Sequence, residues 1–296
     1  MGKTFALTVS AMVAFAANSL LCRAALGERT IDAASFTTVR LVSGALTLWL
    51  IVRFTRRNTA RGSGDWVAAA MLFLYAVAFS FAYLSLTAGT GALILFGLVQ
   101  LTMFVVGLRG GERFAPLSWA GFATAVAGVA YLVSPGVAAP SPVGAALMAL
   151  AGVAWGVYSL RGRGVPDPLS ATAGNFIRTV PLALLVSALM IGEVRGSWRG
   201  VALATASGAV TSAIGYVIWY AALRGLNATR AATVQLSVPA IAALGGVLLL
   251  SEPVTERLLL SSLAILGGIA LVFTQRSGDI PPGRAAAPLR SRTDPS

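Results

Sequence analysis

Apolar runs of about 20 residues recur along nearly the whole chain and are separated by short polar segments. Each run, as a helix, is long enough to cross a hydrocarbon layer about 30 Å thick. With 57% hydrophobic and 11% charged residues among 296, the chain differs from soluble domains, in which roughly a quarter of residues are charged. A membrane β-barrel would instead show segments of about 10 residues with alternating polarity, and the sequence has none. We therefore predict an all-α integral membrane protein.

The apolar runs predict ten transmembrane helices joined by short connections, several of which contain Gly or Pro. The first run follows a single Lys and lacks a convincing cleavage site, so we expect it to be a retained helix rather than a signal peptide. Residues 277–296, rich in Pro, Arg and Ser, are expected to form a disordered cytoplasmic tail. The ten predicted spans are 4–22, 32–54, 66–86, 90–108, 117–134, 143–160, 169–191, 199–222, 229–250 and 256–274.

The strong positive charge, 22 Lys and Arg against 10 Asp and Glu, is placed mainly in the short loops between the predicted helices. This distribution is typical of a membrane topology signal, so we expect no nucleic-acid partner. Basic residues on the side of the N-terminus outnumber those on the other side by about three to one, which predicts that both termini are cytoplasmic. Cys22 is the only cysteine and histidine is absent, which excludes an internal disulfide and argues against a zinc site; we expect neither metal nor cofactor.

The two halves of the chain are related by an internal repeat with an offset of about 140 residues. A Ser-Leu-x-x-Arg pattern ends the first predicted helix and recurs at the end of the sixth, and single residues match further along each half. Each half therefore holds five helices, and because five is odd the halves have opposite topology in the membrane. We predict a first repeat over 1–137 and a second, inverted repeat over 138–276. The matched pairs are Ser19 and Ser159, Leu20 and Leu160, Arg23 and Arg163, Arg40 and Arg178, and Glu112 and Glu252.

One long apolar helix of each half is interrupted near its centre. The stretch 227–253 carries no charge between Arg230 and Glu252 and has Pro239 in its middle, while its counterpart over 89–113 has Gln100 at that place. Interrupted hydrophobic helices in matching positions of two halves indicate the substrate site of a transporter.

The ten-span plan, an Arg in the second helix of each half and a Glu closing the fourth resemble the drug/metabolite transporter superfamily, specifically its EamA-type members. Within that group the chain looks most like the YddG-type exporters of aromatic and other amino acids. The resemblance covers about residues 4–275. It implies a central cavity surrounded by the first, third, fourth, sixth, eighth and ninth helices. Gln100 departs from the pattern, since such helices often carry Pro at this place.

Aromatic side chains fall on single faces of three predicted helices and are candidates for the lining of that cavity. Rings with a few polar groups suit a zwitterion that has an apolar side chain. For a single ring, ordinary helix packing or lipid contact is the competing explanation. The mid-span Asn and Gln side chains are further candidates because polar groups in hydrocarbon need partners. The predicted substrate-binding residues are Asn18, Tyr75, Phe79, Ser80, Tyr83, Gln100, Trp155, Tyr158, Tyr216, Trp219 and Gln235.

Three further pairs of residues are assigned structural roles. Pro239 and Pro181 cannot donate to the helix ladder, so we predict a kink and a hinge at each. Arg40 and Arg178 could hold a substrate carboxylate, but we expect pairing with backbone carbonyls instead. Gly152 and Gly156 predict a close helix contact.

The sequence favours an inner-membrane exporter of small amphipathic metabolites, with amino acids, aromatic ones included, as the expected substrates, and it argues against an enzyme. Its acids lie in loops, in the tail or at helix ends, so it offers no obvious proton-relay residue and no catalytic set. One alternative is a multidrug exporter of cationic compounds from the same superfamily. A distant alternative is a membrane enzyme or scaffold that transports nothing. The expected partners are a small-molecule substrate and the lipid bilayer, with a monomer as the simplest state.

Overall fold

The computed structural model describes residues 2–55, 64–111, 114–162, 165–226 and 228–276, and within them it is built of helices. Eight of these helical segments are long and apolar enough to cross a membrane, and the shorter apolar helix Trp66–Ala82 accompanies them. The expected all-helical membrane architecture is therefore confirmed. The count of ten spans and the inverted repeat stay predictions.

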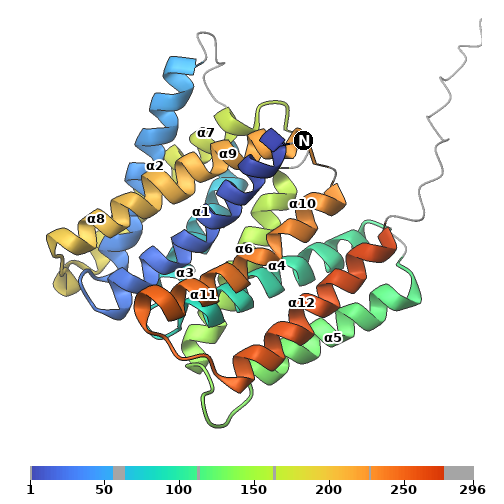
Figure 1. Cartoon of the computed structure of the whole chain (residues 1–296). Coiled ribbons are helices and arrows are strands. Elements are labelled where there is room, and N and C mark those ends of the chain that lie inside the picture. Colours follow the sequence, from blue (N-terminus) through green and yellow to red (C-terminus); the bar gives the residue numbers. More distant parts are fainter. Residues whose placement is uncertain (1, 56–63, 112–113, 163–164, 227, 277–296) are drawn as a thin grey trace, which may run out of the picture.

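Twelve α-helices, a short 3₁₀ turn and one π-helix follow one another in the described part of the chain (Figure 1). They are α1 (Gly2–Gly27), α2 (Ala33–Thr55), α3 (Trp66–Ala82), α4 (Ala88–Arg109), α5 (Pro116–Val133), α6 (Pro142–Arg161), α7 (Pro168–Leu189), η1 (Ile191–Glu193), α8 (Trp198–Ala206), η2 (Ser207–Ile214), α9 (Gly215–Leu223), α10 (Ala228–Gln235), α11 (Ser237–Leu250) and α12 (Glu256–Arg276).

Polar residues in the loops fix where several helices begin. Asp65 accepts hydrogen bonds from the backbone N–H groups of Val67 and Ala68 at the start of α3. Asp167 caps α7 in the same way through the N–H of Ser170, and Pro168 follows it at the first helical position. Such caps satisfy N–H groups that have no partner inside the helix.

Two loops meet at the end of the bundle where α1 ends and α8 begins. An isolated antiparallel bridge joins Ile31 to Gly196. Beside it, the backbone N–H of Arg195 donates to the Asp32 carboxylate at 3.0 Å. Partial burial raises the pKa of Asp32, but backbone N–H donors from Ser35 and Arg195 outweigh it, so the pKa lies below the usual range. The carboxylate thus stays charged and ties the two loops together.

Helix pairs from distant parts of the chain pack side by side. Figure 1 shows α12 lying along α5, apart from the group formed by α1, α2, α8 and α9. Within the core, α6 packs against both α3 and α4. A Cβ added at Gly152 would lie 2.7 Å from the carbonyl oxygen of Leu95, and one at Gly156 would lie 3.0 Å from Thr102. The predicted close helix contact is therefore confirmed, and it brings Trp155 of α6 toward the centre of the bundle.

Candidate functional site

A cavity opens near the middle of the bundle, between seven helical segments. Its empty space, with the open solvent at its mouth included, is about 430 Å³. The segments that contribute to its wall are α1, α3, α4, α6, η2, α9 and α10, which belong to the six predicted spans that were expected to surround a cavity. The lining residues are Phe15, Asn18, Ser19, Tyr75, Phe79, Leu95, Phe96, Trp155, Thr211, Ser212, Tyr216 and Gln235.

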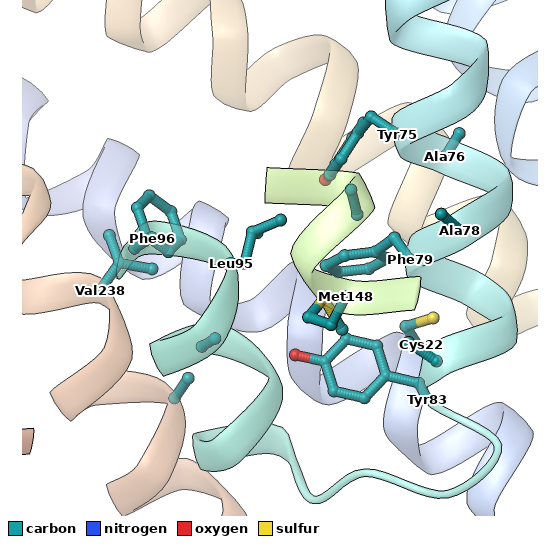
Figure 2. Packing of buried hydrophobic residues seen from close by; sticks show 14 of the residues in the cluster. Cys22, Tyr75, Ala76, Ala78, Phe79, Tyr83, Leu95, Phe96, Met148 and Val238 are labelled. Atoms are coloured by element: carbon teal, nitrogen blue, oxygen red, sulfur yellow. The ribbon is translucent and has the colours of Figure 1, made fainter. Parts of the chain in front are cut away.

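Aromatic rings form a continuous wall on one side of this cavity. The ring of Trp155 lies between Tyr75, at 4.8 Å between centroids, and Tyr216, at 5.5 Å. Phe79 continues the wall along α3 at 5.3 Å from Tyr75, and Figure 2 shows both rings on the same face of that helix. Rings at these separations stabilise one another and leave flat apolar surface for a ligand.

A hydrogen-bonded network from α1 and η2 reaches this wall. The carboxamide oxygen of Asn18 accepts hydrogen bonds from Ser207 at 2.7 Å and Thr211 at 3.2 Å. Thr211 shares its single proton between Asn18 and the Ser207 carbonyl, which lies 2.8 Å away, and the Asn18 amide nitrogen donates to the Tyr75 hydroxyl at 3.3 Å. The network therefore holds three helical segments in one arrangement around the Tyr75 hydroxyl.

The segment that supplies both hydroxyl donors is a π-helix. Its wider turn places Ser207 and Thr211 toward Asn18, and Thr211 also lines the cavity. Gly208 makes the arrangement possible, because its α-carbon faces the backbone carbonyl of Arg40 so closely that a Cβ would collide with it. Short π-helical stretches often occur at functional sites.

Arg40 lies directly behind the aromatic wall and is only 2% exposed. Its Nη2 donates to the Tyr75 hydroxyl at 3.0 Å, and its guanidinium carbon lies 5.0 Å from the Phe79 ring centroid and 5.2 Å from that of Tyr75. Its Nε and Nη1 have no hydrogen-bond partner in the structure, and within the described residues Arg40 forms no ion pair. A buried cation without an anion is unfavourable in a membrane protein and points to a functional role.

This geometry can be compared with known proteins. Residues 142–274 match the EamA-like transporter family, and over 276 residues, 93% of this chain and 96% of the other, the sequence is 52% identical to the "Uncharacterized protein PA1977" of Pseudomonas aeruginosa. The chain belongs to the EamA-like transporter family. It is thus a multi-pass membrane transporter.

Two more distant similarities agree with membership of the EamA-like family. An "Uncharacterized transporter" of Archaeoglobus fulgidus is 27% identical over 169 residues, which cover 56% of this chain and 60% of that protein. A solved crystal structure has the same fold, with a TM-score of 0.67 over 93% of this chain and 99% of that chain, at 18% identity. The second similarity describes the fold alone.

Six of the eleven residues predicted for substrate binding in this EamA-like transporter line the cavity. They come from α1, α3, α6, α9 and α10, which are far apart in the sequence. Their assignment to substrate binding stays a prediction. The six are Asn18, Tyr75, Phe79, Trp155, Tyr216 and Gln235.

The other five predicted residues pack outside the cavity wall. The Ser80 hydroxyl donates to the Ala76 carbonyl in its own helix at 2.9 Å. Tyr83 lies one turn beyond Phe79, as Figure 2 shows, and its hydroxyl donates to the Ala88 carbonyl. Tyr158 packs on Trp155 with centroids 5.3 Å apart, and Trp219 packs edge to face on Phe15. These four side chains support the wall from behind rather than forming it.

Gln100 is the fifth of these residues, and it is a polar side chain without a hydrogen-bond partner among the described residues. It is buried on α4, and both its amide nitrogen and its amide oxygen lack a hydrogen-bond partner in the structure. It follows Phe96 by one helical turn, so it lies beyond the cavity along α4. The sequence places an amide where the other half has Pro239, and the structure does not bring that amide to the cavity.

The two predicted hinge prolines occupy different settings. At Pro239 the helix is interrupted: α10 ends at Gln235 and α11 begins at Ser237. Proline removes the N–H that would bond to the carbonyl four residues earlier, which here belongs to Gln235. Pro181, by contrast, lies inside α7, which continues through it to Leu189. Gln235, the last residue of α10, lies at this interruption and lines the cavity, whereas the hinge role of both prolines stays a prediction.

Arg40 was expected to pair with backbone carbonyls, and this expectation is wrong, because its guanidinium contacts the Tyr75 hydroxyl and two aromatic rings. For Arg178 the same expectation is confirmed, since its Nη1 donates to the Gly174 carbonyl at 2.9 Å. Sequence reasoning noticed Arg40 but gave it no site role. It also missed Phe15 and Thr211. For Phe15, the only signal in the sequence is its helical spacing from Asn18.

The described residues contain no group of three or more His, Cys, Asp and Glu side chains that could hold a metal ion. What the cavity offers is a stacked aromatic surface, a hydroxyl held by two donors and a cation behind it. This arrangement can bind an organic molecule that has an apolar part and a polar end.

Proposed function

We propose that this transporter exports small amphipathic metabolites, namely amino acids including aromatic ones, across the bacterial inner membrane. The observation that carries the proposal is the cavity itself, in which Tyr75, Trp155 and Tyr216 form an apolar wall beside the Asn18 network. Such a site would stack an apolar side chain and hydrogen-bond a polar backbone group.

The proposed transport cycle is alternating access around this cavity. We propose ten spans arranged as two inverted five-helix repeats, 1–137 and 138–276, with both termini cytoplasmic. Rocking of one bundle against another would expose the cavity to each side in turn. The interruption between α10 and α11 supports this proposal, because a helix broken beside the cavity can change its angle without losing further hydrogen bonds. The tail 277–296 lies outside the described residues.

Reconstitution in liposomes tests the proposal. We expect saturable flux of labelled tryptophan and threonine that is indifferent to a proton gradient and lost in Trp155→Ala. A matched control is Trp198→Ala, because Trp198 lies at the start of α8, is 84% exposed and is not part of the cavity lining. Flux that requires the proton gradient would contradict export driven by the concentration gradient of the solute alone. Absence of amino-acid flux, together with flux of organic cations, would instead establish the multidrug alternative.

A further inference from the structure

We propose that the Tyr75 hydroxyl, with the Arg40 guanidinium behind it, binds a carboxylate on the transported molecule. The cavity would then select an amphipathic monocarboxylate, such as a zwitterionic amino acid, over the corresponding amide or an organic cation. This inference rests on the proposed transport function and names the chemical group that the same cavity recognises.

The first argument comes from the hydrogen bonds of the Tyr75 hydroxyl. A phenolic oxygen has two lone pairs and a single proton. Arg40 Nη2 at 3.0 Å and Asn18 Nδ2 at 3.3 Å donate to the oxygen, and both can act only as donors there. No described atom accepts the proton in return, while Tyr75 itself lines the cavity. The hydroxyl is therefore set to donate into the cavity, and an acceptor on the ligand would complete its hydrogen bonding.

The direction of every donor in the network supports this assignment. The Ser207 hydroxyl donates to the Asn18 carboxamide oxygen at 2.7 Å, and the Thr211 hydroxyl shares its proton between that oxygen and the Ser207 carbonyl, with the amide nitrogen facing Tyr75. In this arrangement Asn18 and Arg40 both donate to the Tyr75 oxygen, and the Tyr75 proton is left for an acceptor on the ligand.

The second argument comes from the charge of Arg40. Its guanidinium is buried, has two nitrogens without a hydrogen-bond partner, and has no anionic side chain in contact within the described residues. The faces of Phe79 and Tyr75 stabilise the cation in part. A carboxylate at the Tyr75 hydroxyl would supply the missing negative charge one hydrogen bond away, in a setting where water screens it little.

The rest of the cavity determines what the carboxylate is attached to. Trp155 stacks beside Tyr75, and Phe79, Leu95 and Phe96 form apolar wall nearby. One donated proton and one cation match the single charge of a carboxylate better than they match a phosphate, which needs several donors. An apolar or aromatic side chain against Trp155 and a carboxylate at Tyr75 would use both parts of the wall.

Binding of phenylalanine and phenylalaninamide to the full chain in lipid nanodiscs tests the inference, with quenching of tryptophan fluorescence as the readout. We expect the wild type to prefer phenylalanine. Tyr75→Phe and Arg40→Met should each weaken phenylalanine binding by about 10- to 100-fold, the usual range for a hydrogen bond to a charged group. Binding of phenylalaninamide should change by no more than about 3-fold.

Two control variants remove the same groups at other places. Tyr220→Phe removes a partly buried hydroxyl that is hydrogen-bonded to Thr172, outside the cavity lining. Arg178→Met removes the arginine that donates to the Gly174 carbonyl. Both should keep the preference for phenylalanine. If Arg40→Met does not fold, Tyr75→Phe, which deletes a single oxygen, decides the test alone.

The outcomes separate the carboxylate site from transport. Equal binding of the two ligands by the wild type, or equal loss of both in Tyr75→Phe, would overturn the carboxylate site. Liposome flux without preference for phenylalanine over its amide would also overturn it while leaving transport intact. Selective binding of phenylalanine without any flux would support the site and count against the proposed export function.

Discussion

Arg23 and Glu252, which belong to opposite halves of the sequence, form an ion pair with 2.9 Å between Nε and Oε1. The second carboxylate oxygen of Glu252 accepts the backbone N–H of Ala88 at 2.8 Å, and Arg23 Nη1 donates to the Tyr83 carbonyl. The pair therefore joins the ends of α1, α3 and α11 to the start of α4. Both side chains are largely buried, at 24% and 10% exposure, so solvent screens the interaction less than it screens a surface pair.

Substitution Glu252→Gln should loosen this end of the bundle. It leaves Arg23 without its anion and is expected to destabilise the fold by about 1–3 kcal/mol. Cys22, the sole cysteine, is fully buried next to Arg23 and reports the change. We expect a faster reaction of Cys22 with a membrane-permeable maleimide in this variant. Glu28→Gln, which removes the exposed pair with Arg199, is the control and should leave the labelling rate unchanged. Equal acceleration in both variants would contradict a specific role of Glu252.

Gly208→Ala should separate η2 from α2. The added Cβ would collide with the Arg40 carbonyl and the Ser43 hydroxyl, and overpacking of this kind typically costs about 1–3 kcal/mol. Thermal unfolding in detergent measures the loss. Gly267→Ala is the matched control, because no atom lies within 4 Å of its added Cβ, and alanine suits the interior of α12 better than glycine. A neutral Gly208→Ala variant would show that α2 and η2 can move apart without cost.

The sequence predicts features that depend on neighbouring residues better than features that depend on contacts between distant helices. Helices follow from apolar runs that must satisfy their own backbone in lipid, so the helix at Asn18, the helix at Trp155 and their neighbours were predictable. The spacing of Tyr75, Phe79 and Tyr83 placed three rings on one face. Only the first two line the cavity, because Tyr83 lies where α3 ends and packs against the start of α4.

The polar network around Tyr75 could not be predicted in the same way. Arg40 and Arg178 match in the internal repeat, yet one lies behind the cavity wall and the other bonds to the Gly174 carbonyl. The difference depends on which helices surround each arginine, and the sequence pattern does not contain that information. The π-helical turn that places Ser207 and Thr211 beside Asn18 likewise depends on packing against α1 and α2.

The stability of the fold should depend on pH through Asp65, which caps the start of α3. The hydrogen bond from Arg161 is the main reason that the pKa of Asp65 lies below its usual range, and the capped N–H groups of Val67 and Ala68 add to it. Because the folded-state pKa is the lower one, the stabilisation is present above the unfolded pKa of about 3.9 and is lost as pH falls through the folded value. Asp65→Asn should remove this acid-side decrease, and thermal unfolding at several pH values between about 3 and 7 measures it. If Asp65→Asn still lost stability at acid pH to the same extent, that loss would come from another carboxylate.

Replacing each proline by alanine tests whether the interruption between α10 and α11 serves transport. In Pro239→Ala the new N–H can bond to the Gln235 carbonyl, so α10 and α11 should approach a continuous helix and draw Gln235 away from the cavity. We expect the liposome flux to fall by about 10-fold or more, since a site displaced by about 1 Å loses much of its efficiency, while the protein unfolds at an equal or higher temperature. Pro181→Ala is the matched control, because α7 already continues through Pro181 and its helix should change little. Equal losses in the two variants would contradict a particular role for the interruption at Pro239, and unchanged flux in both would remove both prolines from the transport cycle.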